Sequence, residues 1–192
     1  MTLQFYQVDA FASKLFAGNP AAIVPLEKWL DDEIMQNIAM ENNLSETAYF
    51  VKEGTHYHIR WMTPVAEVSL CGHATLASAY VIFNFVEKDA AQIKFTSKSG
   101  ELIVDREGEL LSLNFPSNKP IKIETTELIK SAFTKEPLEV LEGGNYSFIV
   151  FDDEEFVRNV NPNFELVKEI HPHGVIITAQ GSDVDFVSRM FA

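Results

Sequence analysis

The sequence predicts an α/β protein built as two lobes, and three observations lead to this prediction. The longest apolar run, Gly72 to Val86, is apolar on every side, which is typical of a helix enclosed by a sheet. Short segments before and after it alternate apolar and polar residues, as half-buried strands do. The polar stretch Pro116 to Pro120 has no periodicity and divides the chain. We therefore expect a first lobe over residues 1–115, with a buried central helix over 72–86, and a partial second lobe over 121–192.

The rest of the first lobe is predicted as one helix and several strands. A helical period begins at Asp31, where acidic residues suit the positive end of the helix dipole, and the helix ends before Ser45. Glycine and proline mark a turn at Phe16 to Pro20. Alternating apolar residues predict strands at residues 3–8, 21–24, 47–51, 57–61, 93–95, 102–104 and 111–115. These strands are expected to surround the central helix.

The second lobe is also predicted to mix helices with strands. Periodicity predicts helices at residues 126–133 and 164–170, and strands at residues 146–151, 175–179 and 184–190. The segment Ile59 to Pro64 resembles Val187 to Ala192, and each follows a glycine-containing turn and an apolar strand. If the lobes share one plan, the second ends before a counterpart of the helix at 72–86. We therefore expect an incomplete second lobe whose exposed apolar sheet favours self-association.

The composition excludes several classes of protein and partner. The chain has 192 residues, 46% of them hydrophobic, which excludes a disordered protein. Its formal net charge of −13 disfavours nucleic acid and anionic membranes as partners, because their phosphate groups would be repelled. The single cysteine forms no internal disulfide, and the sequence shows neither an apolar leader nor a membrane-spanning run. A cytoplasmic protein that binds a small molecule is therefore expected.

Two short motifs predict a proton-transfer site. Glu46 lies in Asn43-Leu44-Ser45-Glu46-Thr47-Ala48, and His73 lies in Cys71-Gly72-His73-Ala74-Thr75 at the start of the central helix. The N–H groups of a helix N-terminus favour an anion, and Gly72 permits a ligand to approach the backbone. Each residue alone has an ordinary interpretation, because most carboxylates are solvated and many histidines at helix ends have no further role. Together the motifs favour a carboxylate, an imidazole and an anion-binding helix end in one site.

Further short motifs occur in a fixed order along the chain. They are Val8-Asp9-Ala10-Phe11, Phe16-Ala17-Gly18-Asn19-Pro20-Ala21-Ala22, Phe50, Met62-Thr63-Pro64 and Glu67-Val68. In order and spacing, these and the two motifs above resemble the phenazine-biosynthesis PhzF-like isomerase family, strongly through residue 115 and more diffusely to Phe191. The resemblance implies a diaminopimelate epimerase-like fold. In that fold two pseudo-symmetric lobes each wrap a curved sheet around a central helix, with the active site between them.

The resemblance also implies roles for individual residues. Glu46 corresponds to the family glutamate that takes a proton from one substrate carbon and returns it to another, without a metal or an organic cofactor. His73 lines the same pocket, and the backbone amides of Gly72 and His73 bind a substrate carboxylate. Asn19, in a turn near the cleft, and Ser45 are expected to contribute to substrate binding. The implied substrate is a small carboxylate-bearing metabolite.

The chain departs from the family pattern near its end. Family members continue with an Asp-Pro-x-Thr-Gly-Ser-Ala-like motif, which supplies a second acid and a second helix N-terminus, and this motif does not occur in the chain. The resemblance therefore implies a chain truncated at its C-terminus, with little isomerase activity unaided. The alternative function is a non-catalytic small-molecule binder, or an inactive remnant that associates through its second lobe as a homodimer.

Other residues with reactive side chains receive structural interpretations. Cys71 takes the place where epimerase relatives keep a catalytic thiol, but such enzymes need two thiols and this chain has one. We expect Cys71 to be a packing residue. His56 and His58, and likewise His171 and His173, lie two residues apart without a carboxylate or thiol at ligand spacing, and are expected at the surface. The sequence therefore predicts no metal site.

Overall fold

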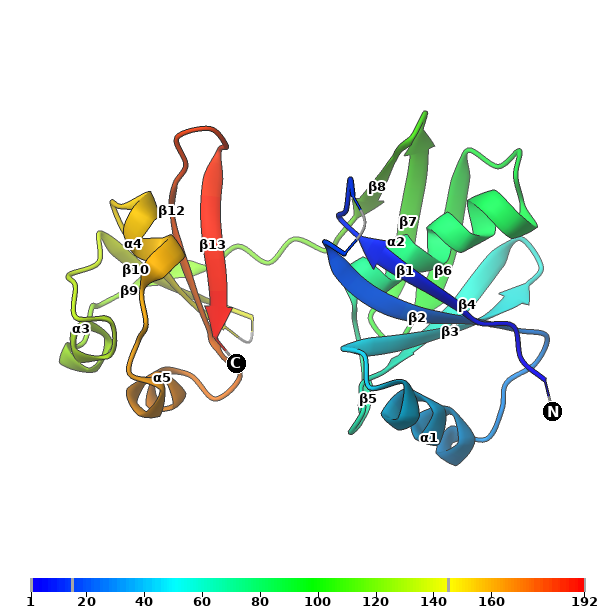
Figure 1. The fold of residues 1–192 in the computed structure, drawn as a ribbon, viewed down its shortest axis with the longest axis horizontal. Coiled ribbons are helices and arrows are strands. Elements are labelled where there is room, and N and C mark those ends of the chain that lie inside the picture. The colour runs from blue at the N-terminus through cyan, green and yellow to red at the C-terminus, as the bar shows by residue number, and fades with distance from the viewer. Residues whose placement is uncertain (1, 15, 145, 192) are drawn as a thin grey trace. The chain divides into compact units, whose positions relative to one another are not determined.

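The computed structural model describes residues 2–14, 16–144 and 146–191, which form two compact units. Unit 1 is Met1–Pro116 and unit 2 is Ser117–Ala192. Both units combine a sheet with helices, as the α/β prediction requires (Figure 1). In the described part of the chain, no helix is long and apolar enough to cross a membrane.

Unit 1 is built on one curved sheet. Its strands are β1 (Tyr6–Ala10), β2 (Asn19–Leu26), β3 (Glu46–Glu53), β4 (His56–Met62), β5 (Glu67–Val68), β6 (Gln92–Ser97), β7 (Gly100–Glu107) and β8 (Leu110–Asn114). They follow the order β1-β2-β3-β4-β6-β7-β8, and β5 pairs with β4. The β2–β3 and β4–β6 pairs are parallel, whereas the other pairs are antiparallel.

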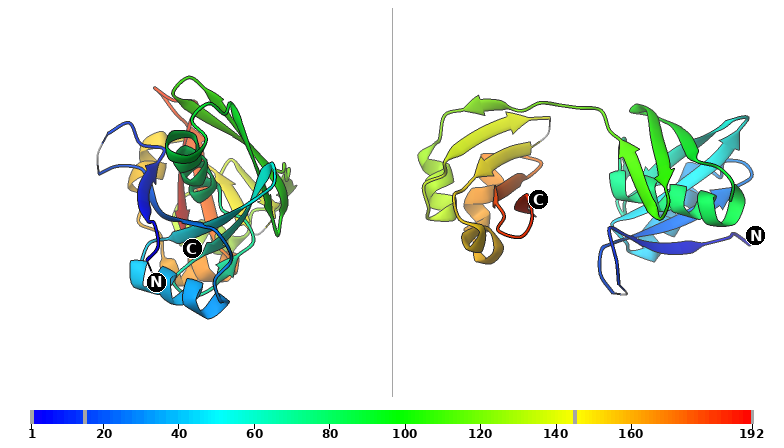
Figure 2. Two further views of the ribbon diagram at one scale, coloured as in Figure 1. Left: turned by 90° about the vertical axis from the view of Figure 1, so that its right-hand side faces the viewer. Right: turned by 90° about the horizontal axis from the view of Figure 1, so that it is seen from above.

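A largely buried helix lies against the inner face of this sheet. α2 (Gly72–Val81) continues into the π-helical turn η1 (Ile82–Val86), and the strands curve around them (Figures 1 and 2). The predicted helix over 72–86 is confirmed, but its predicted enclosure on every side is wrong at Tyr80 and Phe85, which are 47% and 56% exposed. The sheet is open between β1 and β8, and therefore leaves one side of the helix uncovered.

The opposite face of the sheet holds a second helix. α1 (Asp32–Asn42) packs Met35 against Tyr49 of β3, and the Tyr49 hydroxyl donates to the Met35 carbonyl at 2.8 Å. Ala48 and Phe50, on either side of Tyr49, belong to the core around α2. Alternate residues of β3 therefore contact opposite helices, as the pleat of a strand requires.

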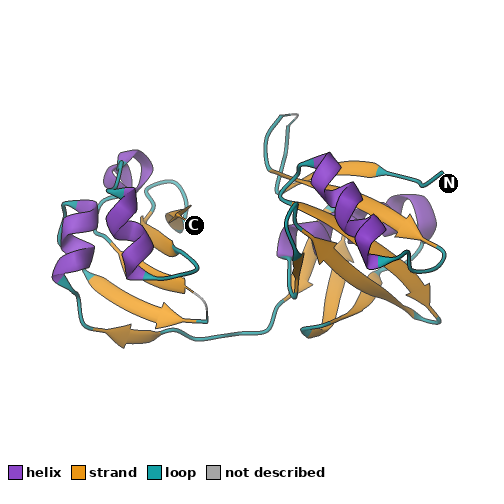
Figure 3. Ribbon diagram, turned by 90° about the horizontal axis from the view of Figure 1, so that it is seen from below, coloured by secondary structure: helices purple, strands orange, loops and turns teal. Residues whose placement is uncertain are grey.

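Unit 2 has a smaller sheet with its own core. Its strands are β9 (Ile121–Ile123), β10 (Glu139–Gly143), β11 (Tyr146–Val150), β12 (Val175–Gln180) and β13 (Phe186–Phe191), in the order β13-β12-β11-β10-β9. Its helices are α3 (Glu127–Phe133), α4 (Glu154–Asn159) and α5 (Phe164–Ile170). Figure 3 shows these helices on one face of the sheet, and buried apolar residues of the helices and strands form one cluster there.

The other face of the unit 2 sheet carries an apolar row. Leu141, Phe148, Ile176 and Met190 are cross-strand neighbours on successive strands β10 to β13. The first three are partly buried and Met190 is 51% exposed, and none of the four belongs to the buried cores. We call these four residues the open face.

Several predicted boundaries differ from the structure. The turn predicted at Phe16 to Pro20 ends earlier, because Asn19 and Pro20 already pair with β1. A proline is tolerated there since it lies at the start of a strand. β5, β9, β10 and α4 were not predicted, because each is short and has few apolar residues from which a period is visible.

Candidate active site

Glu46 is placed at the start of β3 by the way α1 ends. Asn43 adopts the left-handed conformation with φ 51° at the C-cap, and its N–H donates to the Ala39 carbonyl. This reversal ends the helix and lets β3 begin at Glu46, which pairs in register with Ala21 of β2. The side chain of Glu46 is 19% exposed, and is therefore partly shielded from water.

Amide side chains hold the residues on both sides of Glu46. The Ser45 hydroxyl donates to Asn19 Oδ1 at 3.3 Å, and Asn42 Nδ2 donates to Thr47 Oγ1 at 3.1 Å. Asn19 and Ser45 were predicted as substrate-binding residues, and the structure places them in contact beside the glutamate. Asn42 and Thr47 were not singled out, because an isolated amide–hydroxyl pair leaves no periodic pattern in a sequence.

His73 lies in the first turn of α2. The helix begins at Gly72, and the Thr75 hydroxyl donates to the carbonyl of the N-cap residue Cys71 at 2.5 Å. A Cβ at position 72 would lie 2.7 Å from Cζ of Phe115, so a larger residue would have to displace that ring. The first N–H groups of a helix have no partner within the helix, and this end is therefore suited to an anion.

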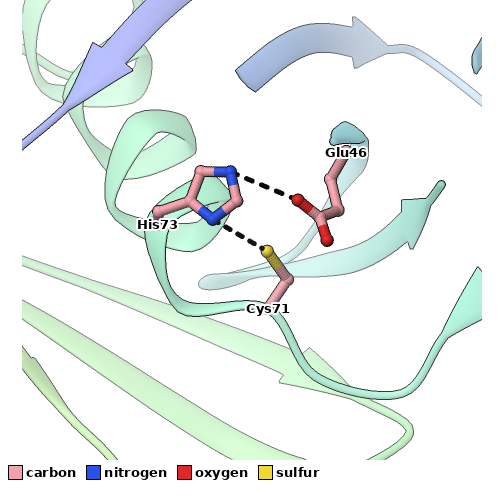
Figure 4. A group of neighbouring side chains, drawn as sticks. All are labelled: Glu46, Cys71 and His73. Carbon is pink, nitrogen blue, oxygen red and sulfur yellow. Dashed lines mark hydrogen bonds and ion pairs between the residues drawn. The ribbon is translucent and has the colours of Figure 1, made fainter. Parts of the chain in front are cut away.

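The side chains of Glu46, Cys71 and His73 meet in one cluster (Figure 4). His73 Nε2 lies 3.3 Å from Glu46 Oε2, an ion-pair distance, and the imidazole is 10% exposed. On its other side, His73 Nδ1 lies 3.5 Å from Cys71 Sγ. Among the described residues, neither Glu46 Oε2 nor His73 Nε2 has a partner with hydrogen-bond geometry. Two shielded polar atoms are thus left to interact with a ligand.

Cys71 is buried, and its thiol is free. Burial, reinforced by the negative charge of Glu46, raises the pKa of the Cys71 thiol to about 12, although the amides of Ala74 and His73 favour the thiolate. The residue belongs to the core around α2, in agreement with its interpretation as a packing residue. The contact of its sulfur with the His73 ring was not predicted.

Three of the four remaining histidines, His56, His58 and His171, have carboxylate neighbours, which corrects the sequence prediction. Glu53 lies 3.7 Å from His56 Nε2 and 3.6 Å from His58 Nδ1, because the β3–β4 hairpin brings the three residues together. Both imidazoles are about one third exposed, at 36% and 35%. His171 is only 11% exposed, so its predicted surface position is wrong, and Glu142 lies 3.8 Å from its Nε2.

Comparison with known proteins identifies the family. The chain matches the family model described as phenazine biosynthesis-like protein over residues 8–192. A protein of Pseudomonas aeruginosa, named as an uncharacterized isomerase, is 46% identical over 192 residues, which cover 100% of this chain and 74% of the relative. The human phenazine biosynthesis-like domain-containing protein is 34% identical over 219 residues, which cover 100% of this chain and 76% of the relative.

Solved structures agree with this result. A PhzF family protein of Enterococcus faecalis has a TM-score of 0.94 at 47% identity, over 100% of this chain and 74% of that one. A hydroxyproline epimerase from Agrobacterium vitis, with a TM-score of 0.57 at 9% identity over 98% of this chain and 69% of that one, shows a shared fold. The predicted diaminopimelate epimerase-like fold class is confirmed. The chain therefore belongs to the phenazine biosynthesis-like PhzF family.

Proposed function

We propose that this protein is a cofactor-independent isomerase that moves a proton on a small carboxylate-bearing metabolite. Several relatives are named as uncharacterized isomerases, which supports an isomerase-type activity. The observation that carries the proposal is the pair of facing atoms, Glu46 Oε2 and His73 Nε2, which lie 3.3 Å apart without hydrogen-bond partners. The one cysteine, buried and free, fits the reducing cytoplasm as the compartment.

Glu46 is the proposed proton carrier. Its Oε2 takes a proton from one substrate carbon, and the electron pair of the broken C–H bond becomes part of a shifted double bond. The same oxygen then returns the proton to a second carbon, so the substrate is neither oxidised nor reduced. A carboxylate can serve as base and then acid because it carries the proton between the two steps. The imidazole of His73 is next to this oxygen and holds the carrier in place.

The N-terminus of α2 is the proposed carboxylate-binding element. The N–H groups of Gly72 and His73 begin the helix, and the helix dipole adds a partial positive charge. Binding the substrate carboxylate there places the rest of the molecule near Glu46, because Glu46 contacts His73. Asn19 and Ser45, already linked beside Glu46, are proposed to orient the bound substrate.

A deuterium-exchange screen tests this function. The protein is incubated in D2O with a panel of small unsaturated and α-substituted carboxylic acids, and substrates are detected by a one-deuteron mass shift. Glu46→Gln keeps the size of the side chain but cannot carry the proton, so it should lose the exchange through kcat. Glu53→Gln, a change of a more exposed glutamate on the same strand, is the matched control and should retain it. Binding of an acid without exchange would instead support a non-catalytic small-molecule binder.

We also propose that the chain self-associates through the open face of unit 2. The four apolar side chains of this face lie outside the buried cores, and contiguous apolar surface of this kind is typical of interaction sites. Light scattering should give a mass above that of the 21.6 kDa chain. Met190→Glu should return the mass to that of a monomer, whereas Val65→Glu, a change of an 88% exposed apolar residue in unit 1, should not. A monomeric wild-type chain would contradict the proposal.

A further inference from the structure

Three kinds of metal-ligating atom come together at Glu46, Cys71 and His73. A carboxylate oxygen, the thiol sulfur and an imidazole nitrogen lie within 4.8 Å of one another, and in the described part of the chain this is the one such set of three (Figure 4). Thiolate, imidazole and carboxylate are the ligands that zinc uses in proteins. We propose that this cluster binds one Zn²⁺ ion per chain and that the bound ion inhibits the enzyme.

The distances fit a zinc site. Cys71 Sγ lies 3.5 Å from His73 Nδ1. In a tetrahedral site, with Zn–S of about 2.3 Å and Zn–N of about 2.0–2.1 Å, the two ligand atoms are about 3.5 Å apart. A zinc ion can therefore be held by both atoms with little movement. Water completes the coordination, together with a carboxylate oxygen of Glu46.

Electrostatics favours a cation in the cluster. The carboxylate of Glu46 attracts Zn²⁺ to the cluster. When the ion binds, the S–H bond of Cys71 breaks, the sulfur keeps the electron pair and coordinates zinc, and the proton passes to solvent. Glu46 Oε2 and His73 Nε2 have no hydrogen bonds to lose.

Zinc binding would block the site proposed for catalysis. The ion uses the carboxylate of Glu46, and this residue can then no longer accept a proton. It also occupies the space beside the first turn of α2. Zinc binding goes beyond the proposed isomerase function and is measured without substrate. Zinc binding can therefore fail while the isomerase function stands, and the reverse also holds.

Titration calorimetry of the chelator-treated protein with ZnCl2 tests the site. We expect one Zn²⁺ per chain in the wild type. Cys71→Ser should bind zinc at least about 100-fold more weakly, because a lost ligand costs more than the roughly 10- to 100-fold that a lost second-shell partner costs. The double variant His56→Gln/His58→Gln removes the imidazoles nearest Glu53 and should bind zinc as the wild type does. MgCl2 should not compete, because Mg²⁺ prefers an all-oxygen site.

A spectroscopic measurement keeps the test independent of the stability of the variants. Co²⁺ replaces Zn²⁺ in tetrahedral sites, and wild-type protein loaded with Co²⁺ should show a sulfur-to-cobalt charge-transfer band in the near ultraviolet. Cys71→Ala should lack this band. A wild-type chain that binds no zinc, a Co²⁺ complex without the band, or zinc binding lost only in the His56→Gln/His58→Gln variant would each overturn the proposal.

Discussion

At the residue scale, the ionisation of the Cys71 thiol makes the stability of the fold depend on pH. Its side chain is 7% exposed and carries a thiol whose pKa burial raises to about 12. In the unfolded chain a cysteine has a pKa of about 8.5. Above that pH the unfolded chain loses a proton that the folded chain keeps. Because the folded state then binds more protons, the free energy of unfolding falls as pH rises towards 12.

Cys71→Ser should remove this pH dependence. Serine does not ionise in the range, so the difference in melting temperature between wild type and variant isolates the thiol from other titrating groups. We expect the wild type to be the more stable at pH 7.5, and its advantage to shrink steadily as pH rises to about 10.5. Thermal unfolding of both proteins in chelator-containing buffer gives the difference in melting temperature at each pH. A difference that stays constant over this range would show that the thiol titrates alike in both states.

Candidate site residues can be predicted from the sequence to the extent that they lie in motifs. The sequence singles out Glu46, Gly72 and His73 because a carboxylate and a helix-start glycine–histidine pair carry recognisable chemistry. Two features of the cluster cannot be predicted from the sequence, namely the contact of Cys71 with His73 and the missing hydrogen bonds of Glu46 Oε2. Both depend on interatomic distances that packing sets.

At the element scale, the end of α1 determines where β3 begins. Asn43 has φ 51°, a conformation that costs most residues about 1–2 kcal/mol and that glycine and asparagine tolerate. Its N–H closes the last turn of the helix onto Ala39. The chain reaches Glu46 only three residues later, so the position of the carboxylate depends on this cap.

Replacement of Asn43 tests whether the C-cap of α1 needs a residue that tolerates a positive φ. Asn43→Gly should unfold at nearly the wild-type denaturant concentration, whereas Asn43→Val should be destabilised by about 1–2 kcal/mol, because a β-branched side chain resists a positive φ. Urea unfolding followed by circular dichroism gives both values. Equal stabilities would mean that residue 43 does not need the left-handed conformation.

Long periodic elements were predictable and short ones were not. α2 with η1 presents an apolar run over three helical turns or more, and its sequence allows few alternatives. α4 has only two apolar residues, Phe156 and Val157, and β9 has three residues in total. Such elements form because a neighbouring sheet or core stabilises them, and a single sequence does not show those neighbours.

At the scale of the whole molecule, each unit has its own core. Unit 1 buries clusters on both faces of its sheet, around α2 and under α1. Unit 2 buries a separate cluster under α3, α4 and α5. The fold class was predictable because the buried helix and the ordered motifs both lie in unit 1. The sheet order of unit 2 could not be predicted, because strands such as β10 show little alternation of apolar and polar residues.

A fragment of residues 1–116 should therefore fold by itself. Its two clusters include the strands, α1 and α2, and among the residues that the structure describes, none beyond Pro116 belongs to either cluster. We expect a dispersed amide NMR spectrum and a cooperative thermal transition. A fragment with the spectrum of an unfolded chain would show that unit 1 depends on the rest of the polypeptide.

At the same scale, the transfer of a labelled proton tests whether Glu46 carries one proton between two carbons. A substrate found by the exchange screen is deuterated at the carbon that loses its proton, and the product formed in H2O is examined by mass spectrometry. Wild-type protein, freed of metal by chelation, should deliver part of the deuterium to the second carbon. Glu46→Gln should form no product. Product formed by Glu46→Gln at the wild-type rate would contradict the role of Glu46 as the proton carrier.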